Sequence, residues 1–423
     1  MIGNRAALGW VLLVVALLAG CGVTPAARGD APTAPVMALI GGRVQPSPEA
    51  APIADGVVLV QGGRITAVGT RDQVRVPAGA TVLDCTGGTV TAGFWNTHVH
   101  FIEPQWRSAA TAPAEQLAGA LRAMLTSYGV VGVLDTGSYL QDTLVLRRRI
   151  ESGEIDGPAI LTAGSGFAPE RGSPFYILPA RIPELARVDD VSMVEAELDR
   201  GADVVKLFTG SFARRDAIVV MPVEIVRAAA DVAHRRGKLV VAHPSNSAGA
   251  RAAIEGGADI LVHTFPTALD GRPWDRALPG MMIERRMAMA PTLKLFPFEL
   301  RRAGLPTDIV NRVLGNAQAQ LRAFAEGGGQ VLFGTDVGYM TDYDPTDEYV
   351  LMQQAGLSYA QILAALTVAP AERFGRAAVA GRLRPGADAD ITVVAGDPER
   401  DIRALAAVRY TVRAGRVIYR RPS

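Results

Sequence analysis

The chain has 423 residues, of which 49% are hydrophobic, and its 43 basic and 42 acidic side chains give a formal net charge of +1. This composition is typical of a well-packed α/β protein and argues against an intrinsically disordered chain. The sequence has no basic patch that would indicate nucleic-acid binding, so we expect no such partner. The length is sufficient for a barrel and a smaller accessory unit.

The N-terminus has the pattern of an exported, lipid-anchored protein. A basic Arg5 precedes an apolar run at residues 8–18, which is short for a membrane span and typical of a signal peptide. The sequence Leu-Ala-Gly-Cys at residues 18–21 resembles a bacterial lipobox, in which Cys21 is diacylated and becomes the new N-terminus. The alternative is an ordinary signal peptide with an incidental cysteine.

We therefore predict a signal peptide at residues 1–20 and, at residues 21–35, the lipidated cysteine and a flexible tether rich in alanine, proline, glycine and threonine. The mature protein would be anchored in the cell envelope, facing the periplasm. Gly22 in place of an aspartate favours the outer membrane, by resemblance to sorted lipoproteins. Beyond Cys21 the remaining cysteine is Cys85, so we expect no disulfide within one mature chain.

Two β-rich regions flank a long middle segment. In residues 36–90, two β-branched runs joined through Gly62 and Gly63 predict a tight hairpin. In residues 379–423 we expect a strand at 391–394 and a hairpin at 408–419, with its turn near residues 414–415. Because each region is too small to bury a core alone, we expect them to meet as one β-sandwich.

The middle segment, residues 91–378, alternates short apolar runs with helical patterns, such as those at 223–236 and 309–326. Eight strands are predicted at residues 94–98, 130–135, 159–163, 204–208, 239–243, 260–263, 287–293 and 331–335. Eight strand–helix units in this length fit a distorted TIM (β/α)₈ barrel. A doubly wound parallel sheet is the alternative.

The strongest local pattern is Thr97-His98-Val99-His100 in the first of these strands. Side chains alternate along an extended segment, so His98 and His100 point to the same side while Val99 faces away. Two imidazoles placed in this way can bind one metal ion. A His-X-His pair alone is only moderately specific for a metal site.

Four further polar residues lie in or at the end of predicted strands. Lys206 lies in an otherwise almost wholly apolar strand, and the others are His243, His263 and Asp336. Barrel enzymes place their catalytic residues at the carboxyl ends of strands. One such residue alone would fit a rim position satisfied by a loop, but five strand ends of this kind favour a functional site. The fifth histidine, His234, lies on a predicted helix and is assigned no role.

With these residues in place, the chain resembles the amidohydrolase superfamily, and within it the branch related to imidazolonepropionases and prolidase-type metal-dependent dipeptidases. Residues 93–100, GFWNTHVH, are similar to the family's first-strand signature, and residues 381–390, GRLRPGADAD, to its return into the sandwich. The resemblance covers nearly the whole mature chain. These motifs are specific for the superfamily and say little about the substrate.

The resemblance implies a binuclear metal centre with a carbamate formed on a lysine. The implied ligands are His98, His100 and Asp336 for the buried metal, His243 and His263 for the second metal, and Lys206, as a carbamate, for both. A lysine in an apolar strand has a lowered pKa, which favours the neutral amine that takes up carbon dioxide. A lysine paired with a nearby carboxylate is the alternative.

Imidazole and carboxylate ligands suit Zn²⁺ best, with Mn²⁺, Co²⁺ and Fe²⁺ as alternatives. Two divalent metals can lower the pKa of a bridging water to about 7. Asp336 would deprotonate that water and pass the proton to the leaving amine, so we predict Asp336 and Lys206 as the catalytic residues. The second metal and a nearby donor would polarise the scissile carbonyl.

Substrate contacts are left open by the sequence. Lys294 follows the seventh predicted strand and is placed either against a substrate carboxylate or in a surface salt bridge. Tyr339 either donates to a developing oxyanion or packs in the protein. Residues 164–186 form either a lid over the site or a packed loop.

Two positions near the predicted ligands depart from the family pattern. Asn96 stands where many relatives have an aspartate, which we expect to weaken a hydrogen bond to a ligand histidine. Ser245 and Asn246 replace a small, glycine-bearing turn after His243. Either residue could cap the following helix, which we favour, or contact the substrate.

The sequence therefore favours a metal-dependent amidohydrolase that cuts an amide bond in a peptide, N-acyl amino acid or related small molecule. The nearest alternative is a mononuclear-metal deaminase or cyclic-amide hydrolase on the same fold, which would function without Lys206 as a bridge. A third alternative is a lipoprotein that has lost its catalytic activity. The substrate would be a dipeptide or other small molecule, and assembly into a homo-oligomer stays open.

Overall fold

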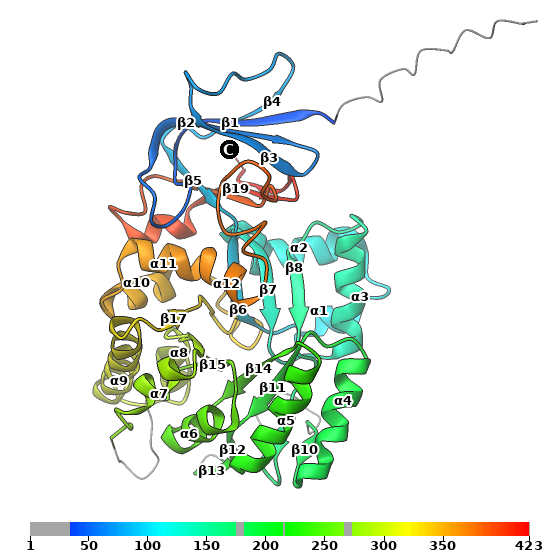
Figure 1. Cartoon of the computed structure of the whole chain (residues 1–423), viewed down its shortest axis with the longest axis vertical. Helices are drawn as coiled ribbons and strands as arrows, with labels where there is room; N and C mark the ends of the chain where they lie inside the picture. The colour runs from blue at the N-terminus through cyan, green and yellow to red at the C-terminus, as the bar shows by residue number, and fades with distance from the viewer. Residues whose placement is uncertain (1–33, 175–181, 215, 266–272, 423) are drawn as a thin grey trace, which may run out of the picture. The chain divides into compact units, whose positions relative to one another are not determined.

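The structure is a computed structural model that describes residues 34–174, 182–214, 216–265 and 273–422 (Figure 1). The predicted signal peptide and Cys21 lie outside the described residues. A search of the described residues found no helix that is both long and apolar enough to cross a bilayer.

Strands from both chain ends belong to one eight-stranded sheet, at the blue and red ends of the colour range in Figure 1. Its order is β20-β19-β18-β5-β1-β2-β3, and β4 pairs with β1. The strands are β1 (Val36–Val44), β2 (Ile53–Gln61), β3 (Arg64–Thr70), β4 (Thr81–Asp84), β5 (Gly88–Ala92), β18 (Ile391–Ala395), β19 (Val408–Arg413) and β20 (Arg416–Arg420). The two ends meet where β18 pairs antiparallel with β5. The arrangement of this sheet as a sandwich stays a prediction.

The two hairpins predicted in these regions are confirmed. Gly62 and Gly63 join β2 to β3 with φ of 56° and 76°. Ala414 and Gly415 join β19 to β20 with φ of 48° and 76°. Two successive residues with positive φ give the turn whose twist matches that of the flanking strands.

The middle segment contains two parallel sheets, β6-β7-β8 and β11-β14-β15-β16-β17. Their strands are β6 (Phe94–Val99), β7 (Val130–Asp135), β8 (Ala159–Thr162), β11 (Val204–Phe208), β14 (Leu239–His243), β15 (Ile260–Val262), β16 (Ala288–Ala290) and β17 (Gln330–Val331). Each of the eight predicted strands is present. The strands predicted at 260–263, 287–293 and 331–335 are shorter in the structure. His263 and Thr292 have positive φ of 66° and 46°, outside the β region, and so cannot extend the first two of these strands.

The two parallel sheets approach each other at both pairs of edges. After β8, the backbone amide of Asp203 donates to the carbonyl of Thr162 at 2.7 Å. Beyond β17, the carbonyl of Phe333 accepts from the amide of Thr97 at 2.7 Å, and the amide of Asp336 donates to the carbonyl of His98 at 2.9 Å. The last contact brings two of the predicted ligands onto neighbouring segments.

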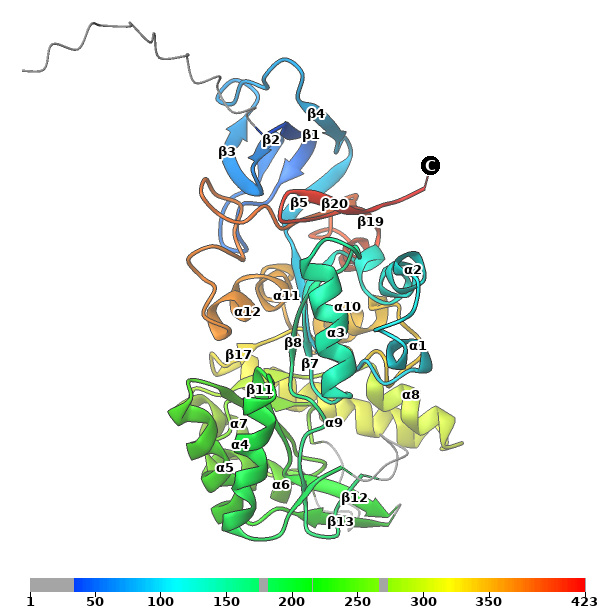
Figure 2. The same cartoon turned by 90° about the vertical axis from the view of Figure 1, so that its right-hand side faces the viewer.

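Helices pack around the parallel sheets, as Figures 1 and 2 show. The predicted helices at 223–236 and 309–326 are confirmed as α5 and α9. The α-helices are α1 (Pro104–Arg107), α2 (Ala114–Met124), α3 (Leu140–Glu151), α4 (Ser192–Asp199), α5 (Val223–Arg235), α6 (Ser247–Gly256), α7 (Leu278–Glu284), α8 (Leu295–Arg302), α9 (Thr307–Glu326), α10 (Thr346–Gln354), α11 (Tyr359–Leu366) and α12 (Val368–Arg373). Helix α5 buries one face, which includes Val226, Ala229 and Ala233, as its apolar spacing predicts.

Short elements follow two strands of the parallel sheets, β8 and β11. Strands β12 (Gly210–Arg214) and β13 (Ala217–Val220) form a hairpin after β11. Strands β9 (Ala168–Pro169) and β10 (Glu184–Leu185) pair across the segment predicted as a lid or packed loop. Residues 175–181 of that segment lie outside the described residues, so its role stays a prediction.

Strand β18 lies inside the sheet, between β19 and β5, so shortening one of its buried side chains should leave a cavity in the core. Ile391 is fully buried in a cluster that includes residues from both chain ends. We expect Ile391→Ala to lower the free energy of unfolding by about 2–5 kcal/mol because it leaves a cavity. The exposed control Val82→Ala, at a side chain 48% accessible, should change it by less than about 0.5 kcal/mol. Equal effects in urea denaturation would contradict this account of the core.

Candidate metal centre

The structure brings His98, His100 and Asp336 together as a group that could hold a metal ion. Each offers a ligand atom, and these atoms lie within 4.8 Å of one another. Oδ1 of Asp336 is 3.2 Å from Nε2 of His98 and 2.9 Å from Nε2 of His100. All three side chains are buried. His98 lies in β6, His100 follows that strand, and Asp336 lies on the adjacent segment, so backbone pairing sets their proximity.

The donor set of this group fits a cation. Among the described residues, none gives Oδ1 of Asp336 a hydrogen bond of acceptable geometry, although the two imidazole nitrogens are close. A buried carboxylate oxygen without such a bond carries a desolvation cost. A divalent metal ion would satisfy this oxygen and both imidazoles at once.

Hydrogen bonds orient two of the predicted ligand imidazoles. Nδ1 of His100 is 2.7 Å from the carbonyl oxygen of Gly137, so Nδ1 carries the proton and Nε2 is left as the metal-binding atom. Nδ1 of His263 is 2.6 Å from the hydroxyl of Thr292. That hydroxyl donates its proton to the carbonyl of Pro291 at 2.9 Å, so it accepts a hydrogen bond from Nδ1 of His263. Nε2 of His263 therefore carries no proton and is available to a metal ion.

His243 and His263 lie beside the first group. The ring centroids of His263 are 4.6 Å from those of both His98 and His243. His243, at the end of β14, retains part of its accessible surface, and its Nε2 is 3.0 Å from the hydroxyl of Ser245. The four predicted imidazole ligands therefore form one continuous cluster.

Lys206 is buried in β11, with 1% of its surface accessible. Burial lowers the pKa of its ammonium to about 7, and the carboxylates of Asp336 and Asp135 oppose this shift. The β-carbon that any other residue would place at Gly166 would lie 2.9 Å from Cγ of Lys206, and Gly166 has a φ of 76°. Glycine at this position thus leaves room for the lysine side chain.

The electrostatics favour the protonation states that a metal requires. Burial lowers the pKa of His98 to about 3 and holds the pKa values of His243 and His263 well below the usual range. Burial opposes the charge on Asp336, but interactions with His98 and His100 outweigh it, and its pKa lies well below the ordinary value. Neutral imidazoles and an ionised carboxylate are the forms that bind divalent cations.

Asp135 also belongs to this region, and it was not among the predicted site residues. Asp135 ends β7, is fully buried, and accepts hydrogen bonds from the hydroxyls of Ser138 at 2.5 Å and Thr162 at 2.6 Å. The amide of Gly137, whose carbonyl holds His100, also donates to Asp135 at 3.3 Å. The pattern that pointed to Asp336, an acid that ends an apolar strand, could have found it.

Asn96 and Asn246, which depart from the family pattern, both form hydrogen bonds within the protein. The side chain of Asn96 accepts from the backbone amides of His98 at 3.3 Å and Thr335 at 3.2 Å, and it donates to the hydroxyl of Thr335 at 2.6 Å. It thereby contacts the backbone of His98. Asn246 caps helix α6 by accepting from the amide of Gly249 at 2.8 Å, as we favoured.

The predicted substrate contacts lie near other groups of the protein. The ammonium of Lys294 is buried and 2.9 Å from a carboxylate oxygen of Asp342. The hydroxyl of Tyr339 is 3.4 Å from the guanidinium of Arg302. The roles of Lys294 and Tyr339 toward a substrate stay predictions. His234, to which we assigned no role, pairs with Asp259 at 2.9 Å.

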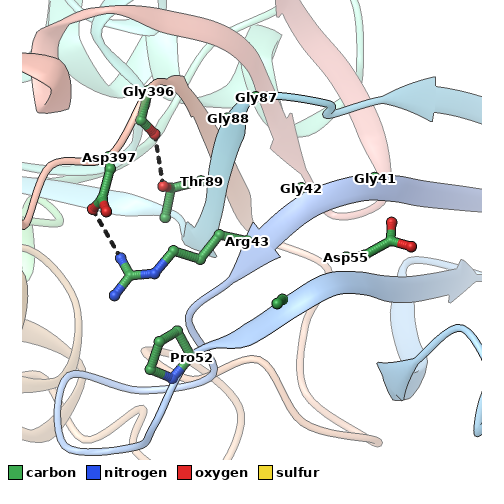
Figure 3. Close-up of a pocket in the computed structure, with 11 residues that line it drawn as sticks. Gly41, Gly42, Arg43, Pro52, Asp55, Gly87, Gly88, Thr89, Gly396 and Asp397 are labelled. Atoms are coloured by element: carbon green, nitrogen blue, oxygen red, sulfur yellow. Dashed lines mark hydrogen bonds and ion pairs between the residues drawn. The ribbon is translucent and has the colours of Figure 1, made fainter.

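A separate hollow of about 370 Å³ lies on the eight-stranded sheet, lined by residues of β1, β2 and β5 and by Gly396 and Asp397 (Figure 3). Its polar groups are paired. The guanidinium of Arg43 is 3.1 Å from Asp397, and the hydroxyl of Thr89 donates to the carbonyl of Gly396 at 2.8 Å. None of the predicted ligands lines it.

Comparison with known proteins places this geometry in a family context. The model of the amidohydrolase family matches residues 89–418, well over half of the chain. Ochratoxinase from Aspergillus niger is 23% identical over 355 residues, which cover 74% of this chain and 71% of that protein.

Solved structures of similar fold include a putative prolidase from Bifidobacterium longum, with a TM-score of 0.76 and 26% identity over 92% of this chain and 96% of that one. A Xaa-Pro dipeptidase with bound methionine in its active site has a TM-score of 0.77 and 20% identity over 91% of this chain and 100% of that one. The family match covers the six predicted ligands, the two parallel sheets and, of the eight-stranded sheet, strands β18 and β19 and most of β5 and β20. The chain therefore belongs to the amidohydrolase family and is a hydrolase that acts on carbon–nitrogen bonds.

Proposed function

We propose that this amidohydrolase uses a binuclear metal centre to hydrolyse an amide bond in a dipeptide, N-acyl amino acid or related small molecule. The observation that carries the proposal is the buried group of His98, His100 and Asp336, in which Oδ1 of Asp336 lies close to both imidazoles. The solved structures of similar fold that are described as a prolidase and a Xaa-Pro dipeptidase support dipeptides as the first substrates to test.

We infer that the two parallel sheets close into a distorted TIM barrel. The hydrogen bonds between the sheets at both pairs of edges support closure. A hydrophobic cluster that takes members from both sheets supports it as well, and it includes Leu134, Val204, Val241, Ile260 and Ala288. In such a barrel the ligands would share the rim at the carboxyl ends of the strands. The eight-stranded sheet would fold over its shared core as the predicted sandwich.

The second metal would bind His243, His263 and a carbamate on Lys206. The adjacent imidazole rings and the buried lysine support this assignment. With a pKa of about 7, a large fraction of the Lys206 amine is neutral at neutral pH. The neutral nitrogen would attack carbon dioxide, so that a C–N bond forms as one C=O π bond opens onto oxygen, and the nitrogen would release a proton to solvent. The resulting carbamate carries one negative charge shared by two oxygens, both of which are potential metal-binding atoms.

When bound, two divalent metals, with Zn²⁺ the best suited to these ligands, supply Lewis acidity and lower the pKa of a water molecule. The side chains of the protein would position the water and transfer its proton. Asp336 holds the water and accepts its proton, because its pKa keeps it ionised. It then delivers that proton to the leaving nitrogen. The hydrogen bonds on Nδ1 of His100 and His263 keep both imidazoles in the ligating tautomer.

One observation favours the mononuclear alternative, a deaminase or cyclic-amide hydrolase. Within the described part of the chain, the group of His, Cys, Asp and Glu residues close enough for one ion comprises His98, His100 and Asp336 and does not include His243 or His263. The two functions differ in their need for Lys206, so a substitution there distinguishes them.

We propose in addition that the mature protein is held in the cell envelope by lipid on Cys21, facing the periplasm. The lipobox-like sequence at residues 18–21 is its support. Growth with labelled palmitate should label the protein but not a Cys21→Ala variant, and an unlabelled parent would contradict the proposal.

The metal content of Lys206→Ala tests the bridging lysine. We expect about two metals per chain in the parent supplied with Zn²⁺ and bicarbonate, and clearly fewer in the variant. Lys238→Ala, a control lysine outside β11, should bind as the parent does. Because carbamate formation needs the neutral amine, reconstitution at a constant concentration of dissolved carbon dioxide should become faster as the pH rises from about 6 to about 8 and then level off. One metal in both parent and Lys206→Ala, by elemental analysis, would favour the mononuclear alternative.

Asp336→Asn tests the proposed base. On the dipeptide or N-acyl amino acid that the parent cuts fastest, we expect kcat to fall by about 10²–10⁴-fold. Asp397→Asn, at the hollow on the eight-stranded sheet, is the matched control and should retain parent activity. Zinc content measured on the same samples separates loss of the base from loss of the metal. An Asp336→Asn enzyme with more than about a tenth of parent kcat would exclude Asp336 as the base.

A further inference from the structure

A buried lysine and a buried glutamate join the segment that follows β16 to the segment that follows Asp336. Lys294 precedes helix α8 and has 4% of its surface accessible. Its ammonium is 3.2 Å from the carbonyl of Asp342 and 2.9 Å from the carboxylate of the same residue, and it donates to the carbonyl of Asp344. The three N–H groups of Lys294 thus have three acceptors on the segment 342–344.

Glu348 makes the reciprocal contact from the first turn of helix α10. It is fully buried, and its two carboxylate oxygens accept from the backbone amides of Leu293 at 2.9 Å and Lys294 at 2.7 Å. These amides lie just before helix α8, where backbone donors have no partner within the helix. The segment before α8 and the segment before α10 are therefore held together by side chains from each.

The first of these segments orients His263. Thr292 directly precedes the two amides that Glu348 binds, and its backbone has a φ of 46°, an uncommon conformation for a β-branched residue. A strained backbone of this kind persists only when its surroundings impose it. The hydroxyl of Thr292 in turn accepts from Nδ1 of His263. Glu348 thus holds the backbone next to Thr292, the residue that is hydrogen-bonded to the predicted metal ligand His263.

The second segment continues the chain after Asp336. Directly after Asp336, the carbonyl of Val337 accepts from the amide of His100 at 2.9 Å. Further along, the hydroxyl of Tyr343 donates to the carboxylate of Glu103, in the loop that follows β6. Lys294 binds the residues on either side of Tyr343. The segment is thereby fixed on one side to the loop after His98 and His100, and on the other side to the loop after β16.

We propose that Lys294 and Glu348 are positioning residues that hold the second metal's ligand His263 at a fixed distance from the first metal's ligand Asp336. We refer to the two residues as the clamp. The proposal rests on the binuclear function proposed above. It gives Lys294 a role through the protein backbone in place of a contact to the substrate carboxylate.

Fold stability alone is a weak explanation for the clamp. Buried charged groups can often be replaced by apolar residues of similar volume with no loss of stability, because removing charges from water is unfavourable. Burial raises the pKa of Glu348 to about 7, against the opposing effect of the two amides and Lys294, so a negative charge at this position is unfavourable. A requirement for defined geometry at the metal ligands accounts for both residues.

The test is a zinc titration of the full-length parent, Glu348→Gln and Lys294→Met, each freed of metal and resupplied with bicarbonate. In Glu348→Gln we expect the affinity for the second zinc to fall about 10–100-fold, the usual effect of removing a group that orients a ligand. The first zinc should bind nearly as in the parent. Lys294→Met should weaken the second zinc as well. The absorption spectrum of the Co²⁺-substituted protein should shift in both variants.

Asp390→Asn is the control for general destabilisation. Asp390 directly precedes β18 of the eight-stranded sheet, away from the predicted ligands, and its carboxylate accepts a hydrogen bond from the amide of Ala414 at 2.7 Å. Burial raises its pKa, as it does that of Glu348. Asp390→Asn should lower the melting temperature without changing zinc affinity or the Co²⁺ spectrum. The proposal would be wrong if Asp390→Asn lost as much affinity for the second zinc ion as Glu348→Gln for the same fall in melting temperature. The clamp would then contribute to stability alone.

Thr292→Val provides a second test if a clamp variant fails to fold. Valine has nearly the same shape as threonine but lacks the hydroxyl that accepts from Nδ1 of His263. Thr292→Val should lower the affinity for the second zinc ion, and Thr292→Ser, which keeps the hydroxyl, should retain the parent affinity. Parent-like binding of two zinc ions by Glu348→Gln, Lys294→Met and Thr292→Val would overturn the clamp alone. A parent that binds one zinc or none would overturn the binuclear function, and the clamp with it.

Discussion

The structure depends on the burial of ionisable groups at the ends of apolar strands. Lys206 lies between Val205 and Leu207 in a buried strand, and three of the four ligand imidazoles are buried as well. Desolvation is the largest contribution to the pKa shifts of Lys206, His98, His243 and His263, and in each case it favours the neutral form. A cluster of neutral donors around one carboxylate can bind cations as soon as it forms. The same burial therefore prepares the site for metal and would be unfavourable without it.

The backbone around this cluster leaves little room for other residues. A β-carbon at Gly338, two residues beyond Asp336, would lie 1.8 Å from the carbonyl oxygen of His100. Asp336 and His263 themselves adopt positive φ, as does Thr292. Such strain is tolerated where surrounding contacts impose it. At Asp336 these contacts are the hydrogen bonds to the β6 segment, and at Thr292 they are the neighbouring bonds to the clamp. The proposed metal sites would thus be set by the backbone as much as by the side chains that bind the metals.

Much of this arrangement could be predicted from the sequence, because each strand is a short apolar run and its functional residue interrupts that run. Lys206 and Asp336 stand out on this ground, and His98 and His100 by their spacing. The two hairpins are equally local, since Gly62-Gly63 and residues 414–415 favour one type of turn.

The remaining features depend on contacts between residues far apart in the sequence. Lys294 and Asp342 are 48 residues apart, and no local pattern distinguishes their buried ion pair from a surface one. Glu348 lies in the first turn of a helix, where an acidic residue is common on a solvated surface. Strands β15 and β16 were predicted too long because His263 and Thr292, just beyond them, adopt positive φ. Cys21, the predicted site of the lipid anchor, is among the residues that the structure does not describe.

The central claim is that one cluster of side chains holds two metals. The most direct measurement is an X-ray anomalous difference map, recorded at the zinc absorption edge from crystals grown with Zn²⁺ and bicarbonate. The account predicts two peaks about 3.5–4 Å apart, one beside His98, His100 and Asp336 and the other beside His243 and His263, with density for a carbamate on Lys206 between them. A single peak at the first position, with an unmodified Lys206, would contradict it.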